Sequence, residues 1–258
     1  MCCFSSAVDL VSDTNIFARR DNGRQFLAYS MTYAARSELA MVLPLPVPPR
    51  TREDAVRFIN LERYPELFDD LAAAFPQLKS RSLQLTGGWM GAPKLKVHDV
   101  GDYEASFVPS LDAFDRLDER FRIPRHVWAQ IPAYTDYGFA VFKLKKSRTD
   151  ADRVHPMAFD FPQRDPSGLY FPTVHIHDRA FHRTAEFDHA LYYQAPRQAH
   201  EDWGHWQESG ALMSAFVDIK RTGGIVDPNQ HCWRVLLNGQ LENKDSWVGS
   251  GYLLPRAA

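Results

Sequence analysis

Residues 15–33 read NIFARRDNGRQFLAYSMTY, and this stretch decides the fold of the chain. Two strand-like runs, Asn15–Arg19 and Gln25–Tyr33, flank the sequence Asp21-Asn22-Gly23. An Asn-Gly pair between such runs favours the tight turn of a β-hairpin, because both residues tolerate positive φ angles. A third run, Glu38–Leu45, ends in a proline-rich segment, and proline cannot donate a hydrogen bond to a central strand. The sequence therefore predicts a three-stranded antiparallel sheet near its start.

The character of the sequence changes twice along the chain. Helical spacing and a plausible N-cap at Thr51 predict a helical insertion over about residues 51–131. Strand-like runs return at residue 137 and continue to the end. We therefore expect a single α+β domain over residues 1–258, with a mixed, mainly antiparallel sheet and inserted helices. The β-rich parts are predicted at residues 1–50 and 137–258.

Composition excludes several classes of protein. The 30 Lys and Arg residues nearly balance 32 Asp and Glu residues, and no long basic run is present, which argues against a nucleic-acid partner. An apolar stretch long enough to cross a bilayer is also missing, so no membrane association is expected. The start lacks the features of a secretory signal, which predicts a cytoplasmic protein. Three cysteines are an odd number and argue against a disulfide framework.

Two segments resemble a bacterial domain family of unknown function. The first is the pair of runs Gln25–Tyr33 and Leu39–Pro48, where the second run ends in a Val-Pro-Val-Pro-like sequence after an early cysteine-rich stretch. The second is the pair of strands Gly138–Leu144 and Met157–Phe161. The resemblance covers the first two thirds of the chain. Many members of that family are exported or membrane-tethered, whereas no secretory signal is expected for this chain. The family has no known activity, so the resemblance implies an architecture only.

The segment from Val174 to His189 carries the strongest functional signal. If Asp178-Arg179 forms a two-residue turn, His175 pairs with His182 across a hairpin. Side chains alternate along a strand, so His175, His177 and His182 would then lie on one face with Glu186. Directly paired Cβ atoms lie about 5 Å apart, close enough for imidazoles to converge on one ion. The spacing therefore predicts a three-histidine metal site.

Three neutral imidazoles and an open position suit zinc, iron or copper. Such a site activates water or dioxygen, with Glu186 as a base or auxiliary ligand, so we expect a metal-dependent enzyme acting on a small molecule or peptide. A closed ligand shell would instead indicate a non-catalytic metal-binding module. A face of solvated histidines without metal is the structural alternative.

Cys2 offers a second chemistry. Removal of Met1 would leave a thiol beside a free α-amine, the arrangement of N-terminal-nucleophile cysteine amidohydrolases, in which the thiolate attacks an acyl carbon. Those enzymes tend to place an Arg and an Asp in an early β-hairpin, and Arg19, Arg20 and Asp21 stand in a loosely similar position, although the four-layer organisation of those enzymes is not evident in this sequence. Cys2 and Cys3 could also ligate the same metal as the histidines, or pack as small apolar residues.

Overall fold

The computed structural model describes residues 3–75, 98–100, 103–147, 151–195 and 206–249. Within these ranges the chain is predominantly β, and its sheets are mainly antiparallel. The predicted antiparallel character is therefore confirmed, while helices contribute less than the α+β prediction implied. No helix in the described ranges is long and apolar enough to cross a bilayer.

The strands of the described residues form two large sheets and one small one. The larger sheet has the order β13 (Gln207–Glu208), β14 (Trp233–Glu242), β12 (Thr184–Gln194), β2 (Leu10–Asp21), β3 (Arg24–Ala34), β10 (Met157–Pro162) and β5 (Arg57–Asn60), with β9 (Asp152–Arg153) also paired to β3. The second sheet has the order β1 (Cys3–Phe4), β4 (Leu39–Leu45), β8 (Gly138–Leu144), β7 (Tyr103–Val108) and β6 (His98–Val100). Strands β11 (Gly168–Phe171) and β15 (Ser246–Gly249) pair separately.

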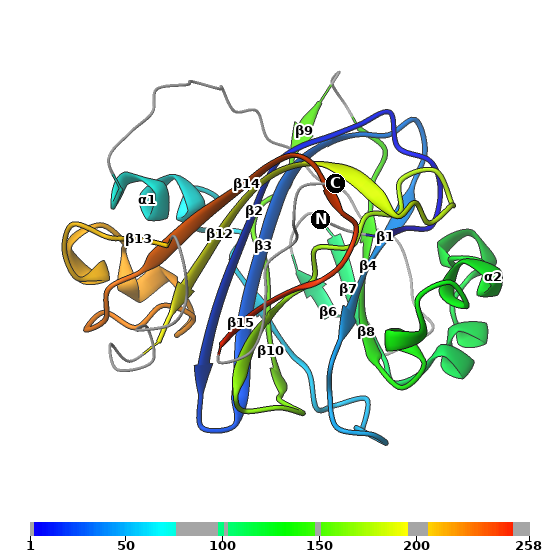
Figure 1. Cartoon of the computed structure of the whole chain (residues 1–258), viewed down its shortest axis with the longest axis horizontal. Coiled ribbons are helices and arrows are strands. Elements are labelled where there is room, and N and C mark those ends of the chain that lie inside the picture. Colours follow the sequence, from blue (N-terminus) through cyan, green and yellow to red (C-terminus); the bar gives the residue numbers. More distant parts are fainter. Residues whose placement is uncertain (1–2, 76–97, 101–102, 148–150, 196–205, 250–258) are drawn as a thin grey trace.

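The helices are short. The α-helices are α1 (Leu67–Ala73) and α2 (Arg125–Trp128). The 3₁₀ helices are η1 (Leu111–Arg116), η2 (Glu119–Phe121), η3 (Pro132–Tyr134), η5 (Met213–Ala215) and η6 (Ile219–Arg221). Figure 1 shows α1 and α2 on opposite sides of the two large sheets.

The N-terminal hairpin forms as the sequence predicts. Strands β2 and β3 pair in antiparallel register up to Asp21 opposite Arg24. Asn22 and Gly23 adopt φ angles of 48° and 73°, which is the left-handed conformation that a type I′ turn needs at both central positions.

Strand β4 explains why the two sheets stack. All seven of its residues are buried, and all except Pro44 belong to one of two hydrophobic clusters on opposite faces of the strand. Leu39, Met41 and Leu43 point into the core between the sheets, whereas Ala40 and Val42 point outward beneath the η1–α2 segment. A strand buried on both faces has a continuous apolar sequence, as β4 does.

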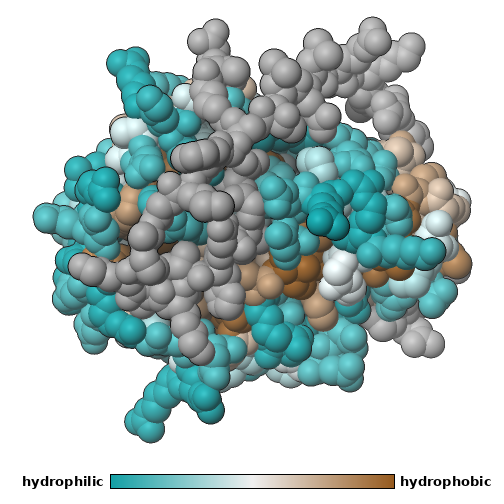
Figure 2. Space-filling model, turned by 180° about the vertical axis from the view of Figure 1, so that it is seen from behind, coloured by the Kyte–Doolittle hydropathy of each residue, from teal (hydrophilic) through white to brown (hydrophobic). Residues whose placement is uncertain are grey.

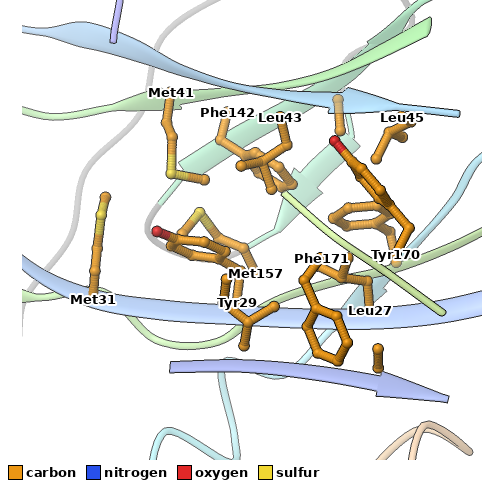
Figure 3. Close-up of a cluster of buried hydrophobic side chains, with 14 of the residues drawn as sticks. Leu27, Tyr29, Met31, Met41, Leu43, Leu45, Phe142, Met157, Tyr170 and Phe171 are labelled. Carbon is orange, nitrogen blue, oxygen red and sulfur yellow. The ribbon is translucent and has the colours of Figure 1, made fainter. Parts of the chain in front are cut away.

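The core between the sheets contains large side chains from both layers (Figure 3). Tyr29 and Met157 extend from the larger sheet towards Met41 and Phe142 of the second sheet. A third cluster fills the outer face of the larger sheet, where Leu67 and Leu71 of α1 pack over strands β2, β3 and β12. The back of the molecule is mostly hydrophilic, with hydrophobic residues visible in a central band and at one edge (Figure 2).

The helical insertion predicted for residues 51–131 is only partly helical. It contains α1, η1, η2 and α2, but also strands β5, β6 and β7. The helix expected after Thr51 is absent, because Arg57–Asn60 pairs with β10 as an edge strand of the larger sheet. The sequence of this segment favours a helix, but pairing with the edge of β10 stabilises a strand instead.

Candidate functional site

The hairpin predicted around Asp178-Arg179 is wrong. Phe171 pairs with Ser246 rather than with Glu186, and Glu186 pairs with Gln240. The physical reason is that β12 is a central strand, with β14 on one side and β2 on the other. Its two edges are therefore occupied, and the segment 173–177 lies against β1 instead.

This change of pairing separates the three predicted metal ligands. His175 is 6% exposed and His177 lies beside it, with ring centroids 5.3 Å apart. The side chain of His182 is 62% exposed, and its Nε2 lies 2.8 Å from the carboxylate of Asp178. His182 therefore faces solvent, away from the other two rings. Glu186 is also exposed, and its Oε2 accepts a hydrogen bond from Gln240.

A different histidine completes the buried group. His189 of β12 is 1% exposed, and its ring stacks on that of His175 at 5.2 Å with an interplanar angle of 27°. The ring centroid of Phe187 lies 4.3 Å from that of His175. Phe187 is on the same inward face of β12 as His189. We call His175, His177 and His189 the histidine cluster. Phe187 and His189 are two positions apart in the sequence of β12, so their side chains lie on the same face of the strand. This spacing indicates that His189 is buried, but it does not indicate which residues contact His189.

Burial keeps the histidine cluster neutral near pH 7. Desolvation lowers the pKa of His177 to about 4, lowers that of His175 further, and places that of His189 well below its ordinary value. Nδ1 of His189 accepts a hydrogen bond from the backbone N–H of Asp188, which assigns the proton of the neutral ring to Nε2. Nε2 of His189 and Nε2 of His175 have no hydrogen-bond partner among the described residues.

The cluster does not have the geometry of a metal site in this conformation. Stacked rings direct their nitrogen lone pairs side by side, whereas a metal needs them to converge at about 2 Å. In the described ranges no group of three His, Cys, Asp or Glu side chains is placed to hold a metal ion. A buried neutral imidazole accepts a proton when an opposite charge beside it stabilises the imidazolium.

Strand β1 brings the N-terminal region to the histidine cluster. Cys3 forms a parallel bridge with Ile176, and the backbone N–H of Phe4 donates to the carbonyl of Ile176 at 2.9 Å. The ring of Phe4 lies 5.6 Å from that of His177. The thiol of Cys3 is buried and lies 3.8 Å from the carbonyl oxygen of Val174. Cys2, the predicted nucleophile, lies outside the described residues.

The side chains of Asn243 and Asp245 hold in place the segment 173–177, which we call the histidine segment. The amide oxygen of Asn243 accepts from the N–H of His175 at 2.7 Å, and its nitrogen donates to the carbonyls of His175 and His182 at 2.9 and 2.8 Å. Asp245 accepts hydrogen bonds from the N–H of Thr173 and from the hydroxyl of Tyr170. Sequence reasoning missed both residues, because nothing local marks a polar residue as the partner of a segment about 70 positions away.

Comparison with known proteins describes the architecture. No family model matches the sequence, so the resemblance to a bacterial domain family stays a prediction. The crystal structure of baculovirus P35 is similar to this chain, with a TM-score of 0.52 and 15% sequence identity. The alignment covers 96% of this chain and 99% of that chain. The two share an overall fold. At this identity the likeness concerns the fold alone, and function has to be argued from the site.

Proposed function

We propose that the chain is a thiol-dependent acyl-transfer protein in which Cys2 is the nucleophile and the histidine cluster supplies the proton acceptor. The observation that carries this proposal is the parallel bridge between Cys3 and Ile176. Extending that parallel register by one residue towards the C-terminus pairs Phe4 with His177. In the sequence, Cys2 directly precedes Cys3 and His175 directly precedes Ile176. The contact between the rings of Phe4 and His177 agrees with this register.

The chemistry needs a thiol and a neutral base side by side. The imidazole of His175 or His177 takes the proton of the Cys2 thiol, and the sulfur then forms a bond to the acyl carbon of an amide or ester. The carbonyl oxygen receives the electron pair and returns it when the bond to the leaving group breaks. The imidazolium gives its proton to the leaving amine or alcohol, and water later hydrolyses the thioester.

Burial disfavours the imidazolium that this step forms. It lowers the pKa of His177 to about 4, whereas an efficient base titrates closer to the working pH. A thiolate beside the ring opposes that effect, because an opposite charge within about 4–6 Å stabilises the cation. The proposal therefore requires an ion pair between thiolate and imidazolium rather than a free base.

The first test asks whether Cys2 is the first residue of the mature protein and carries a free α-amine. Intact-mass analysis is expected to show that Met1 has been removed. Treatment with 2-cyanobenzothiazole, which condenses with a terminal cysteine carrying a free amine, is then expected to modify Cys2 alone. Retention of Met1 would contradict an N-terminal-nucleophile mechanism.

The second test measures acyl transfer directly. With p-nitrophenyl acetate, we expect a burst of p-nitrophenolate in the wild-type protein, loss of the burst in Cys2→Ser, and at least about a tenfold slower burst in His175→Phe. Cys232→Ser is the matched control, because Cys232 is a buried thiol whose pKa is raised by desolvation and which packs in a different hydrophobic cluster from Cys3. An equal burst in Cys2→Ser and wild type would exclude Cys2.

The metal-dependent function remains a prediction with a separate test. A metal would need the stacked rings of His175 and His189 to turn so that their unpartnered Nε2 atoms converge. Metal analysis of untagged protein, prepared under reducing conditions, is expected to give about one equivalent of zinc, iron or copper if this occurs. His175→Ala would then lose the metal, whereas His182→Ala would keep it, because His182 faces solvent.

A further inference from the structure

Strand β14 lies at one margin of the larger sheet, and most of its outer edge has no neighbouring strand in the described part of the chain. On one side β14 pairs with β12 along its whole length, whereas on the other side β13 pairs only with Trp233 and Arg234 (Figure 1). We propose that residues 236–242, which we call the β14 edge, pair antiparallel with the same residues of a second copy of the chain and form a symmetric dimer. This dimer does not depend on the chemistry proposed for Cys2.

The outward backbone groups of the β14 edge belong to even-numbered residues. The carbonyl of Cys232 accepts the N–H of the residue after β13 at 2.8 Å, whereas the N–H of Asn243 donates to the carbonyl of the residue before β12 at 2.9 Å. Along a strand, the backbone groups of successive residues point to opposite sides, and the register of β14 on β12 is unbroken. The N–H and C=O groups of Leu236, Asn238 and Gln240 therefore point away from β12, towards the place of a further strand.

The β14 edge lacks the features that keep strand edges apart in monomeric proteins. Such edges are short, charged, or interrupted by proline or a bulge. Residues 235–241 contain no charged residue and no proline, and their pairing with β12 has no bulge. By contrast, the marginal strands β1, β6 and β5 have two, three and four residues, and β5 begins with Arg57. The β14 edge is therefore the one among these marginal strands that can accept a long partner strand.

Strand β13 limits the register that a second copy can take. Hydrogen-bonded pairs must join even-numbered residues, because these carry the outward backbone groups. With Gly239 opposite Gly239 of the second copy, Leu236 faces Glu242. The next register in one direction would place Glu242 opposite Arg234, whose outer side β13 already occupies. The next register in the other direction would place Leu236 beyond the end of β14. The register centred on Gly239 therefore uses the longest part of the edge.

The side chains that meet in this register are complementary. On the inner face Leu237 lies opposite Leu241 of the second copy, and both belong to the core between the sheets. On the outer face Asn238 lies opposite Gln240, and both are exposed in the single chain. At the centre, a Cβ added to Gly239 would have no atom within 4 Å, so the space beside this residue is open. Apolar groups therefore meet apolar groups, and amides meet amides.

Charge complementarity favours a second copy in antiparallel orientation. Arg234 and Glu242 lie at opposite ends of β14 on its outer face, with uncharged residues between them. In the proposed register Arg234 of each copy lies diagonal to Glu242 of the other copy, and diagonal neighbours are about 7–8 Å apart, within reach of long side chains. Arg234 now donates to the amide oxygen of Gln207, and Glu242 pairs with Lys244 at the surface. A parallel arrangement would instead bring ends of the same sign together.

Sedimentation velocity on the full chain measures the dimer. Between about 1 and about 200 µM, we expect the monomer of 29.6 kDa to convert into a species of twice that mass. Amide hydrogen exchange of residues 236–240 should slow over the same range, because pairing occupies their outward N–H groups. A chain that stays monomeric at the highest concentration would overturn the proposal. Slow exchange that is independent of concentration would also overturn it, and would show that another segment of the same chain covers the edge.

Two substitutions at Leu236 test the register. The residue is 48% exposed and lies on the outer face, so neither substitution alters the core. Leu236→Glu places like charges opposite each other at Glu242 of the second copy, while Leu236→Lys places opposite charges there. We expect the dimer dissociation constant of Leu236→Glu to be at least about fivefold larger than that of Leu236→Lys. The difference should shrink in about 1 M NaCl, which screens the charges.

Leu212→Glu is the matched control, because Leu212 is 40% exposed and lies outside β14. Its dimer dissociation constant is expected to stay within about twofold of the wild type. Equal dissociation constants for Leu236→Glu and Leu236→Lys would overturn the proposal. A dimer weakened by Leu212→Glu but not by Leu236→Glu would do the same, because the copies would then meet elsewhere.

Discussion

The hydroxyl of Tyr170 donates a hydrogen bond of 2.8 Å to Oδ2 of Asp245, and so fixes the carboxylate that binds the backbone N–H groups of Thr173 and Val174. The same oxygen accepts the hydroxyl of Tyr134 at 2.7 Å, while Oδ1 accepts the N–H of Thr173 at 2.9 Å. Burial raises the pKa of Asp245, and these hydrogen bonds oppose the shift. The carboxylate therefore connects η3, β11 and the turn before β15 at one point.

Replacement of this carboxylate by an amide is expected to destabilise the fold. In Asp245→Asn the nitrogen faces groups that are themselves donors, so at least one partly buried hydrogen bond is lost. We expect the free energy of unfolding, measured with urea, to fall by about 1–3 kcal/mol. Asp54→Asn is the control, because Asp54 is exposed and pairs only locally with Arg52. An effect no larger than that of the control would show that the carboxylate is dispensable.

The stability of the fold is expected to decrease in mild acid. In the unfolded chain His177 binds a proton below its ordinary pKa of 6.5, whereas in the folded protein it does so only near pH 4. The unfolded state therefore takes up the proton first, and the contribution of His177 is complete above pH 6.5 and declines between these two values. For this residue alone the loss amounts to about 3 kcal/mol.

Urea unfolding at a series of pH values measures this slope. In His177→Phe the slope between pH 6.5 and about 4 is expected to become shallower, because the titrating ring is gone. His126→Phe should keep the slope of the wild type, since His126 is exposed. Superimposable profiles for wild type and His177→Phe would mean that His177 does not couple folding to protons.

Removal of the amide clamp is expected to loosen the histidine segment. Asn243→Ala leaves the buried N–H of His175 without its acceptor and the carbonyl of His175 without its donor. We expect a loss of about 1–3 kcal/mol of unfolding free energy. Faster amide exchange of residues 174–177 would locate the effect. Asn60→Ala, which removes one exposed side-chain hydrogen bond to the N–H of Glu62, should change the stability by less than about 0.5 kcal/mol.

A methyl group at Gly138 is expected to disturb the contact between β8 and β7. The added Cβ would lie 2.5 Å from two ring atoms of Phe107 and 3.0 Å from Val47, closer than carbon atoms approach. Gly138→Ala should therefore destabilise the protein by about 1–3 kcal/mol. Gly210→Ala is the matched control, because its nearest atom is 3.8 Å away. Comparable melting temperatures for the two variants would contradict the close packing at Gly138.

The parts of the fold that could be predicted depend on local signals. Asn22-Gly23 determines the first hairpin through backbone conformation alone, and the unbroken apolar sequence of β4 indicates a strand buried on both faces. The strand at Arg57–Asn60 could not be predicted in this way. It forms because β10, a hundred residues later, has an edge with which it can pair. The local sequence does not indicate that this distant edge exists.

The candidate site shows the same division. The spacing of His175 and His177 correctly places both side chains on a shared face of an extended segment, where their rings contact each other. The partner strand was wrong, because the prediction assumed that neighbouring segments pair with each other, whereas β12 pairs with β2 and β14. Register between distant strands is determined by the whole sheet, and the third member of the cluster, His189, follows from it.

The parallel pairing of β2 with β12 has a consequence for how the chain is synthesised. Residue 14 pairs with residue 189, so one edge of the first hairpin stays open until most of the chain has left the ribosome. Contacts between such distant positions slow folding, because a long loop must close before they form. During that interval the β2 edge is exposed to other nascent chains. We therefore expect yields of the recombinant protein to improve when translation is slowed by low temperature.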